Sequence, residues 1–231
     1  YATVLSDERF WQAIWFNIRY AIMLDIGVIL ISLLIALALN NLKGKTSTLF
    51  RSIFFIPAVL SLVTVGLIWN ELFLRAFPPI GEALGIEWLS KSILGSPATA
   101  IFGILIVNLW QGCATPTVLL LAGLQSVPSD LYEAATIDGA NAWQKFKNIT
   151  VPFLIPIITM LVITTTKGGL TIFDYIQAMT AGGPAQSTEA IGILIYRHAM
   201  SEGKFAQSVA ESMCLFVIVA IVSFLTIKIS S

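Results

Sequence analysis

Five long apolar runs with very few charges constrain this chain more than any other feature of its sequence. They cover about residues 20–39, 53–73, 98–121, 151–172 and 210–229. A helix needs about 20 mostly apolar residues to cross a hydrocarbon core of about 30 Å, and each run is of that length. Because the runs are continuous and separated by loops, they predict helices and not the alternating strands of an outer-membrane barrel. We therefore expect an all-α, polytopic membrane protein.

The composition excludes several classes of function. Hydrophobic residues make up 57% of the 231 residues and charged residues 11%, whereas a soluble domain has about 25% charged residues. The formal net charge is zero, so no basic field attracts nucleic acid, and we expect no nucleic-acid partner. With two cysteines and one histidine, the sequence predicts no metal site.

Basic residues in the connectors predict the orientation of the chain in its membrane. If the runs alternate in direction, six basic residues fall on one side: Lys43, Lys45, Arg51, Lys145, Lys147 and Lys228. The positive-inside rule then makes that side cytoplasmic. The long connector 123–152 is cytoplasmic, the connectors 74–97 and 173–207 are external, and the N-terminus is outside.

The cytoplasmic connector carries the most specific pattern. Ser129 is a candidate N-cap and Gly139 a candidate C′ residue of a short helix. A second short helix is expected over about 141–147, before Pro152 and Pro156 mark the start of the fourth run. Small side chains on the first helix would let another protein approach closely. The alternative is an ordinary amphipathic helix in a loop.

Glu133, Ala134 and Ala135, followed by Gly139, Ile149 and Pro152, match the spacing EAA-x3-G-x9-I-x-L-P, with Val151 in place of leucine. This signature resembles the membrane subunits of binding-protein-dependent ABC importers. The resemblance implies a coupling helix that docks on an ATP-binding subunit. The residues that it assigns to this coupling are Leu131, Tyr132, Glu133, Ala134, Ala135, Asp138 and Gly139.

Further elements are similar to the carbohydrate branch of that family. They include Asn-Leu-Trp-Gln-Gly at 108–112 and Thr-Ala-Gly-Gly-Pro at 180–184, which favours the F-type subunit of maltose permeases. The resemblance implies a single transmembrane domain over 1–231 with the helical bundle of type I importer permeases, in a prokaryotic plasma membrane. That fold has six spans, so we expect this chain to begin after the first of them.

The same resemblance implies the partners. They are a second, homologous permease subunit, two ATP-binding subunits, an extracellular or periplasmic substrate-binding protein and the lipid membrane. Nothing in the sequence resembles a phosphate-binding P-loop. We therefore expect no enzyme activity and no cofactor in this chain, with ATP and Mg²⁺ on the partner subunits.

Polar and small residues inside the apolar runs are candidates for a substrate path, because an unpaired polar group in lipid is costly. Asn108 and Gly112 are one helical turn apart and share a face. Thr165, Gly169 and Ile172 form a second group at positions that match the sugar site of maltose-type relatives. For Asn108 the alternative is a hydrogen bond between helices, and for Gly112 it is close helix packing.

Lys167 is the most unusual residue of the fourth run, since it lies about two-thirds of the way across the membrane. A charge at the centre of a bilayer costs at least about 2.5–3.5 kcal/mol. Three interpretations stay open. Lys167 extends to the outer surface, pairs with Asp25 or Asp174, or faces the path and holds an acidic sugar.

The main hypothesis is a permease subunit that translocates a monosaccharide or oligosaccharide delivered by a binding protein. One alternative is the same architecture importing an acidic sugar derivative or a glycerol phosphodiester. Remote alternatives are a membrane-embedded enzyme and a transporter without an ATPase. Co-purification with an ATPase discriminates the main hypothesis from both of these.

Overall fold

The computed structural model describes residues 1–42 and 44–230, and these form helices and connecting turns without a strand. Lys43 and the side chain of Lys45, two of the residues behind the predicted orientation, lie outside this description. The longer helices are α2 (Glu8–Asn40), α3 (Gly44–Phe55), α4 (Leu62–Glu71), α5 (Phe77–Leu84), α6 (Ala100–Gly112), α7 (Ala114–Ser126), α8 (Ser129–Ile137), α10 (Val151–Leu170), α12 (Ile191–Met200) and α13 (Phe205–Ser230). The short ones are α1 (Ala2–Leu5), η1 (Ile56–Val59), η2 (Leu72–Ala76), η3 (Ile93–Gly95), α9 (Ala142–Lys145), η4 (Phe146–Thr150) and α11 (Asp174–Met179).

Three described helices are long and apolar enough to cross a membrane by themselves: α2, the segment Ala142–Leu170 and α13. Two further crossings are bent pairs. The chain turns by 45° between α6 and α7, and by 95° between Thr48–Val59 and Leu62–Leu84. The five predicted spans are therefore found only if each bent pair counts as one. The predicted span over 53–73 is not one continuous helix, because Leu60 and Ser61 are extended and break the helix there.

Helix α2 begins twelve residues before the first apolar run, at Glu8. The Asp7 side chain caps it by accepting a hydrogen bond from the Arg9 amide at 2.9 Å. Phe10, Ala13 and Ile14 are buried in this first part of the helix, where they pack with residues of α12 and α13. Tertiary packing at the N-terminal end of α2 thus extends the helix beyond the hydropathy signal.

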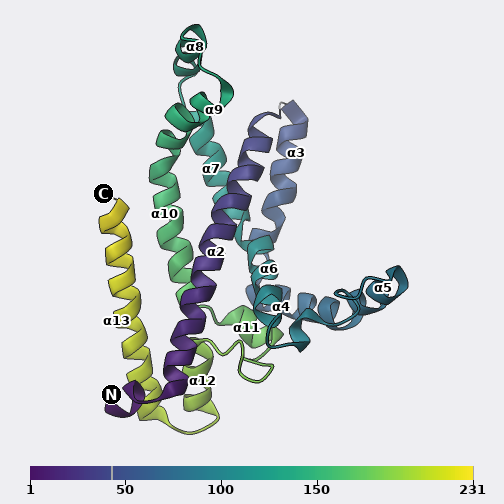
Figure 1. Ribbon diagram of the computed structural model, residues 1–231, viewed down its shortest axis with the longest axis vertical. Coiled ribbons are helices and arrows are strands. Elements are labelled where there is room, and N and C mark those ends of the chain that lie inside the picture. Colours follow the sequence, from purple (N-terminus) through teal and green to yellow (C-terminus); the bar gives the residue numbers. More distant parts are fainter. Residues whose placement is uncertain (43, 231) are drawn as a thin grey trace.

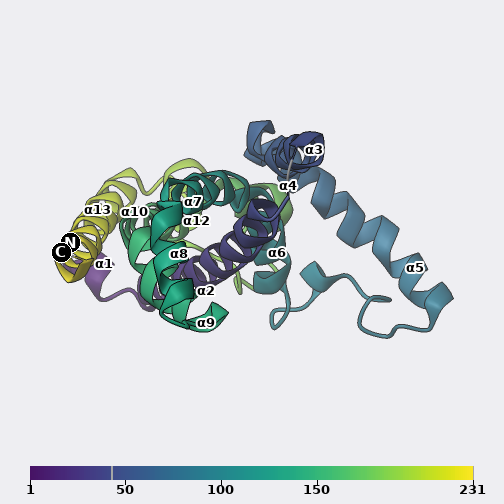
Figure 2. The same ribbon diagram turned by 90° about the horizontal axis from the view of Figure 1, so that it is seen from above.

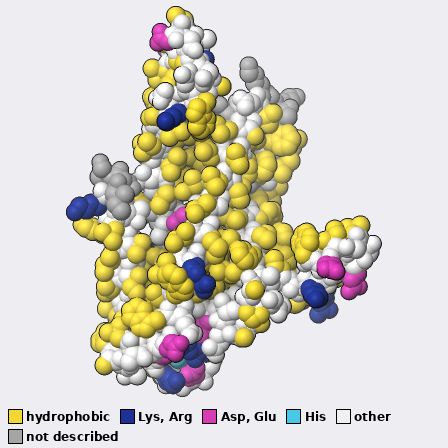
Figure 3. Space-filling view, viewed as in Figure 1, with side chains coloured by type: hydrophobic (Ala, Val, Ile, Leu, Met, Phe, Trp, Pro, Cys, Tyr) yellow, Lys and Arg dark blue, Asp and Glu magenta, His cyan; other side chains and the backbone are white. Residues whose placement is uncertain are grey.

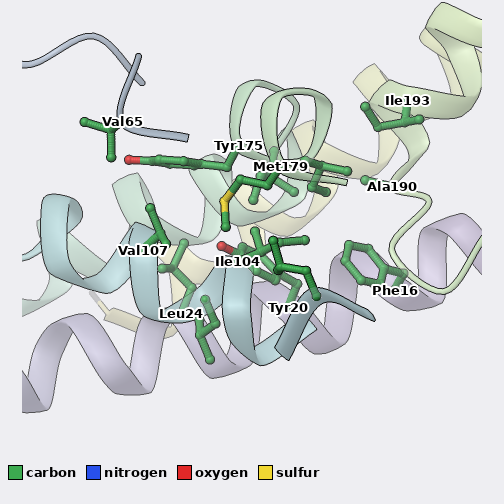
Figure 4. Packing of buried hydrophobic residues seen from close by; sticks show 14 of the residues in the cluster. Phe16, Tyr20, Leu24, Val65, Ile104, Val107, Tyr175, Met179, Ala190 and Ile193 are labelled. Carbon is green, nitrogen blue, oxygen red and sulfur yellow. The ribbon is translucent and has the colours of Figure 1, made fainter. Parts of the chain in front are cut away.

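Helix α2 lies at the centre of the fold, packed along both α10 and α7. A large apolar cluster joins its middle to α4, α6 and α11, and Figure 4 shows Tyr20, Ile104 and Met179 meeting there. Smaller clusters hold the two ends of the bundle, with α2, α7 and α10 at one end and α2, α12 and α13 at the other.

The helices run nearly side by side along the long axis, with α8 projecting beyond α7 and α10 at one end and the N-terminus at the other (Figure 1). After the 95° turn, α4, η2 and α5 form an arm that leaves the bundle sideways, as the view along the axis shows (Figure 2). The connector 74–97 holds α5, and the connector 173–207 holds α11 and α12. Hydrophobic side chains cover the middle of the molecule, whereas charged ones gather mainly at its ends and on the arm (Figure 3).

Candidate functional site

A cavity of about 520 Å³ lies in the middle of the bundle, where three breaks in helices come together. The breaks are the one between η1 and α4, the one between α6 and α7, and the end of α10 with the start of α11. Backbone that is not helical is tolerated at membrane depth where it lines a cavity, and broken helices build the substrate sites of many transporters. The described lining residues are Leu24, Val28, Ala58, Leu60, Leu62, Asn108, Gln111, Gly112, Thr115, Thr165, Gly168, Thr171, Ile172, Phe173, Asp174 and Tyr175.

The cavity brings together four of the six residues that the sequence assigns to a substrate path: Asn108, Gly112, Thr165 and Ile172. Lys167 and Gly169 are not among its lining residues. Gly168, which the sequence analysis did not select, lines it, and a Cβ added there would meet nothing within 4 Å.

Asn108 has two roles in the geometry. Its Nδ2 donates a hydrogen bond of 2.9 Å to the hydroxyl of Tyr20, which ties α6 to α2. Its Oδ1 receives no hydrogen bond from any described residue and is therefore an open acceptor in the cavity wall. A Cβ at Gly112 would lie 3.2 Å from that oxygen, so the absence of a side chain at 112 keeps the acceptor accessible.

Gln111 is a structural residue of the cavity that sequence reasoning missed. It is 5% exposed, and its Nε2 donates to the carbonyl oxygens of Pro57 at 3.0 Å and Leu60 at 2.8 Å. These two carbonyls flank the break between η1 and α4. The hydroxyl of Tyr175 donates to Gln111 Oε1 at 2.7 Å. A glutamine amide inside an apolar run was the available signal, because a buried amide needs partners.

Neither Asp25 nor Asp174 forms the ion pair with Lys167 that the sequence left open. Thr165 and Thr166 both donate hydrogen bonds to the carboxylate of Asp25, the latter at 2.6 Å. Lys167 is exposed and has no ion pair with Asp25, Asp174 or any other described residue. The ion pair is therefore absent from the described part of the chain, and the other two interpretations of Lys167 stay predictions.

Gly169 serves close packing of α10 against α2. A Cβ built on it would lie 2.6 Å from Ala21 Cα and 2.8 Å from Ala21 Cβ. Beside this contact, the buried Asn17 donates to the carbonyl oxygens of Gly169 at 3.2 Å and Leu170 at 2.9 Å. Its Oδ1 accepts from the Ile191 amide at 2.8 Å. One buried amide thus joins α2, α10 and α12.

The predicted short helix of the cytoplasmic connector is present as α8, and Gly139 follows its end with φ +75°. The Ala140 amide donates to Ala135 O at 2.8 Å and the Gly139 amide to Thr136 O at 3.1 Å, which is the Schellman pattern. The prediction of Ser129 as N-cap is wrong. Ser129 is the first helical residue, and its hydroxyl contacts the Asp130 carboxylate at 3.3 Å.

The second predicted helix also differs from the expectation. Asn141 caps α9 with a capping box to Gln144. The helix does not stop there, because the π-helical turn η4 joins α9 directly to α10. Pro152 lies inside this continuous helix, directly after the π-helical turn, where its missing N–H removes one backbone hydrogen bond. The segment Ala142–Leu170 is therefore one rod of 29 residues.

Helix α8 has no buried residue. Leu131 is 41% exposed and Ile137 is 87% exposed. The helix is held to the rod by a hydrogen bond of 2.8 Å between the hydroxyls of Tyr132 and Thr150. It is held also by Lys145 Nζ, which donates to Thr136 Oγ1 at 2.8 Å. The segment is thus an exposed surface with apolar side chains, connected through α10 to the cavity wall.

A second polar cluster lies at the opposite end of the bundle. The carboxylate of Glu189 is 4% exposed and is shared by Arg9, at 2.7 and 2.8 Å, and Arg197. This cluster holds the Thr-Ala-Gly-Gly-Pro loop, since Arg197 also donates to the carbonyl oxygen of Ala181 at 2.9 Å.

Beside it, ligand atoms of Asp7, His198 and Glu211 lie within 4.8 Å of one another, a grouping that the sequence analysis did not predict. His198 Nδ1 is 2.8 Å from Glu211 Oε1, and Gln207 bonds to both carboxylates. Hydrogen bonds within the protein therefore occupy these groups.

Comparisons with known proteins agree with this geometry. Residues 28–230 match the family described as "Binding-protein-dependent transport system inner membrane component". The multiple sugar-binding transport system permease protein MsmF of Streptococcus mutans is 44% identical over 231 residues, which cover all of this chain and 79% of that protein. The trehalose/maltose transport system permease protein MalF of Thermococcus litoralis is 33% identical, over 99% of this chain and 77% of that protein.

The fold is similar to a chain in the crystal structure of a bacterial ABC transporter involved in the import of the acidic polysaccharide alginate. The TM-score is 0.87 at 22% sequence identity, and the match covers 99% of this chain and 81% of that chain.

Proposed function

Since the chain belongs to the family of inner membrane components of binding-protein-dependent transport systems, we propose that it is the permease subunit of an ATP-driven carbohydrate importer. The observation that carries the proposal is the connection between two sites. A cavity at the broken helices is joined by the continuous α9–η4–α10 rod to the exposed helix α8. In such a chain, movement of α8 by an ATP-binding subunit would be transmitted along the rod to the cavity that holds the solute.

The lining of the cavity suits a neutral saccharide. It offers the Asn108 Oδ1 acceptor, the hydroxyl of Thr115 and the Asp174 carboxylate, with Phe173 as an aromatic surface. Sugar hydroxyls donate to such acceptors. Among the described lining residues there is one carboxylate and no lysine or arginine, which disfavours an acidic sugar or a glycerol phosphodiester. The sugar transport named for MsmF and MalF supports the carbohydrate class.

Helix α8 would dock on an ATP-binding subunit through the face that carries Leu131 and the segment from Glu133 to Gly139. ATP and Mg²⁺ would be held by two such subunits, and a second permease subunit would complete the path. Closure of the ATP-binding subunits would displace α8 and, through the Tyr132–Thr150 hydrogen bond, the base of α10. The binding protein would deliver the sugar at the opposite, external end.

Within this chain α10 and α2 would move as one body. They are joined by the Gly169–Ala21 contact, by the Asn17 hydrogen bonds and by the two threonines on Asp25. The facing wall of the cavity belongs to η1, α4 and α6, which Gln111 holds together. Displacement of one wall relative to the other would open the cavity alternately to each side of the membrane.

The test is sugar-stimulated ATPase activity of the complete complex in lipid, with its binding protein and a panel of neutral and acidic saccharides. We expect stimulation by a neutral sugar. Failure of the chain to co-purify with any ATPase would refute the importer. Stimulation only by acidic sugars would refute the assignment of a neutral substrate.

Two substitutions test the cavity and the docking surface independently of each other. Gly168→Leu fills open space in the cavity and should abolish sugar stimulation in a complex that still assembles. Ile137→Asp places a charge on α8 and should weaken co-purification of the ATP-binding subunits. Met200→Asp, at a 69% exposed position at the other end of the bundle, is the matched control and should retain them.

A further inference from the structure

Arg19 has no anionic partner in the described part of the chain, and neither does Arg51, whose Nε is buried without a hydrogen bond. Arg19 lies on α2 directly before the first apolar run, its side chain is exposed, and no hydrogen bond or ion pair joins it to another described residue. By contrast Arg9, Arg75 and Arg197 each pair with a carboxylate. Arginine side chains near the ends of membrane helices extend to the interface, where anionic lipid headgroups are available as partners.

Two hollows of opposite character meet at Arg19. One has a volume of about 290 Å³ and a mostly polar lining that includes Gln12 and Gln186. The other has a volume of about 470 Å³ and a mostly apolar lining that includes Ile22, Ile101 and Phe102. Arg19 and Ser187 line both of them. A ligand with a polar and an apolar part would fill both hollows at once.

The order of the hollows follows the axis of α2. Gln12, Trp15, Arg19 and Ile22 are spaced by three or four residues and therefore share one face of the helix. The polar hollow lies toward the N-terminal end of α2, and the apolar hollow lies deeper, beside the residues that follow Arg19. This is the order of headgroup and acyl chain in a lipid whose leaflet lies at the N-terminal end of α2.

Ser187 supplies an independent observation. Its Oγ is buried and has no hydrogen-bond partner among the described residues. A buried hydroxyl without a partner is costly, and this one lines both hollows together with Arg19. The carboxylate of Glu189 in the polar hollow is already shared by Arg9 and Arg197, so its charge is compensated.

We propose that these two hollows form a binding site for an anionic phospholipid. The phosphate contacts the Arg19 guanidinium next to Ser187, and an acyl chain lies in the apolar hollow beside Ile101 and Phe102. A soluble anion would leave the apolar hollow empty, which is why the geometry points to a lipid. The orientation of the proposed importer places this lipid in the outer leaflet, whereas the site itself does not depend on the transported solute.

The test uses the complete complex in nanodiscs of phosphatidylcholine mixed with phosphatidylglycerol, with retained lipids counted by native mass spectrometry. Wild type should retain phosphatidylglycerol in preference to phosphatidylcholine. Arg19→Gln should lower that preference about fivefold, the effect of one cation near an anionic surface. Arg75→Gln is the matched control, because Arg75 lies in η2 on the arm that leaves the bundle and pairs with Glu71. This variant should retain the preference.

Ala98→Phe keeps the charge and obstructs the apolar hollow. It should also lower retention of phosphatidylglycerol, while Arg19→Lys should restore much of what Arg19→Gln loses. The proposal is overturned if Arg19→Gln and wild type retain the same lipids. It is overturned also if glycerol phosphate competes as well as the intact lipid, or if Arg19 cross-links to an acidic residue of the partner permease. None of these outcomes depends on which sugar stimulates the ATPase.

Discussion

Two adjacent glycines near the end of α10 should respond in opposite ways to the same substitution. A Cβ at Gly168 meets nothing within 4 Å, whereas a Cβ at Gly169 lies 2.6 Å from Ala21 Cα on α2. Carbon atoms in contact prefer a separation of about 3.5–4.0 Å. Gly169→Ala therefore forces α2 and α10 apart by about 1 Å, and Gly168→Ala forces nothing.

Comparing Gly168→Ala with Gly169→Ala measures the free-energy cost of the added methyl group against Ala21. Replacing a helical glycine by alanine gains up to about 1 kcal/mol of helix propensity, and this gain is common to both variants. An added methyl group in a well-packed interior costs about 1–3 kcal/mol. The two variants should therefore differ by about 1–3 kcal/mol, with Gly168→Ala the more stable. Separation of the helices would also lengthen the Asn17 hydrogen bonds, which adds to the difference.

The assay is the thermal midpoint of the assembled complex in detergent, followed by size-exclusion chromatography after heating. We expect the midpoint of Gly169→Ala to fall below wild type and that of Gly168→Ala to equal or exceed it. Equal midpoints for the two alanine variants would show that α2 and α10 do not touch at Gly169.

Three further predictions concern other parts of the chain. Gly139→Ala, at φ +75°, should lower the stability of the end of α8 by about 1–2 kcal/mol. It should reduce sugar stimulation of the ATPase more than it reduces co-purification of the ATP-binding subunits, with both measured on one preparation. Gln111→Leu strands two carbonyl groups and the Tyr175 hydroxyl at about 1–3 kcal/mol per buried group, so its thermal midpoint should drop, whereas an unchanged midpoint would refute the structural role. Hydrogen bonds from Lys204 and Arg9, opposed by desolvation, lower the pKa of Glu202. The stability that this carboxylate contributes is fully present above its unfolded pKa and is lost as the pH falls through the lower folded pKa. The thermal midpoint of wild type should therefore fall on acidification by more than that of Glu202→Gln.

Local sequence signals determined the features that depend on neighbours in the chain. Hydropathy identified the five apolar segments, since a run of about 20 apolar residues has few other uses. Gly139 marked the end of α8, because a C′ residue with positive φ favours glycine. The EAA-type spacing identified the family, which the comparisons confirm.

The sequence was less informative where chemistry depends on distant partners. It grouped Asn108 with Gly112 and selected Thr165 and Ile172, and the fold brings all four to one cavity. It did not predict that Thr165 and Thr166 would donate hydrogen bonds to Asp25, and it left three interpretations open for Lys167, which is exposed.

The tertiary structure alone decided which face of each apolar helix points inward. Core and lipid are both apolar, so a membrane helix carries little of the polar and apolar periodicity that orients a helix in a soluble protein. For this reason neither the packing of Gly169 on Ala21 nor the opening of Gly168 toward the cavity could be read from the chain. The sharp turn after η1 likewise depends on tertiary structure. The carbonyl groups of Pro57 and Leu60 at this turn accept hydrogen bonds from Gln111, about fifty residues away in the sequence.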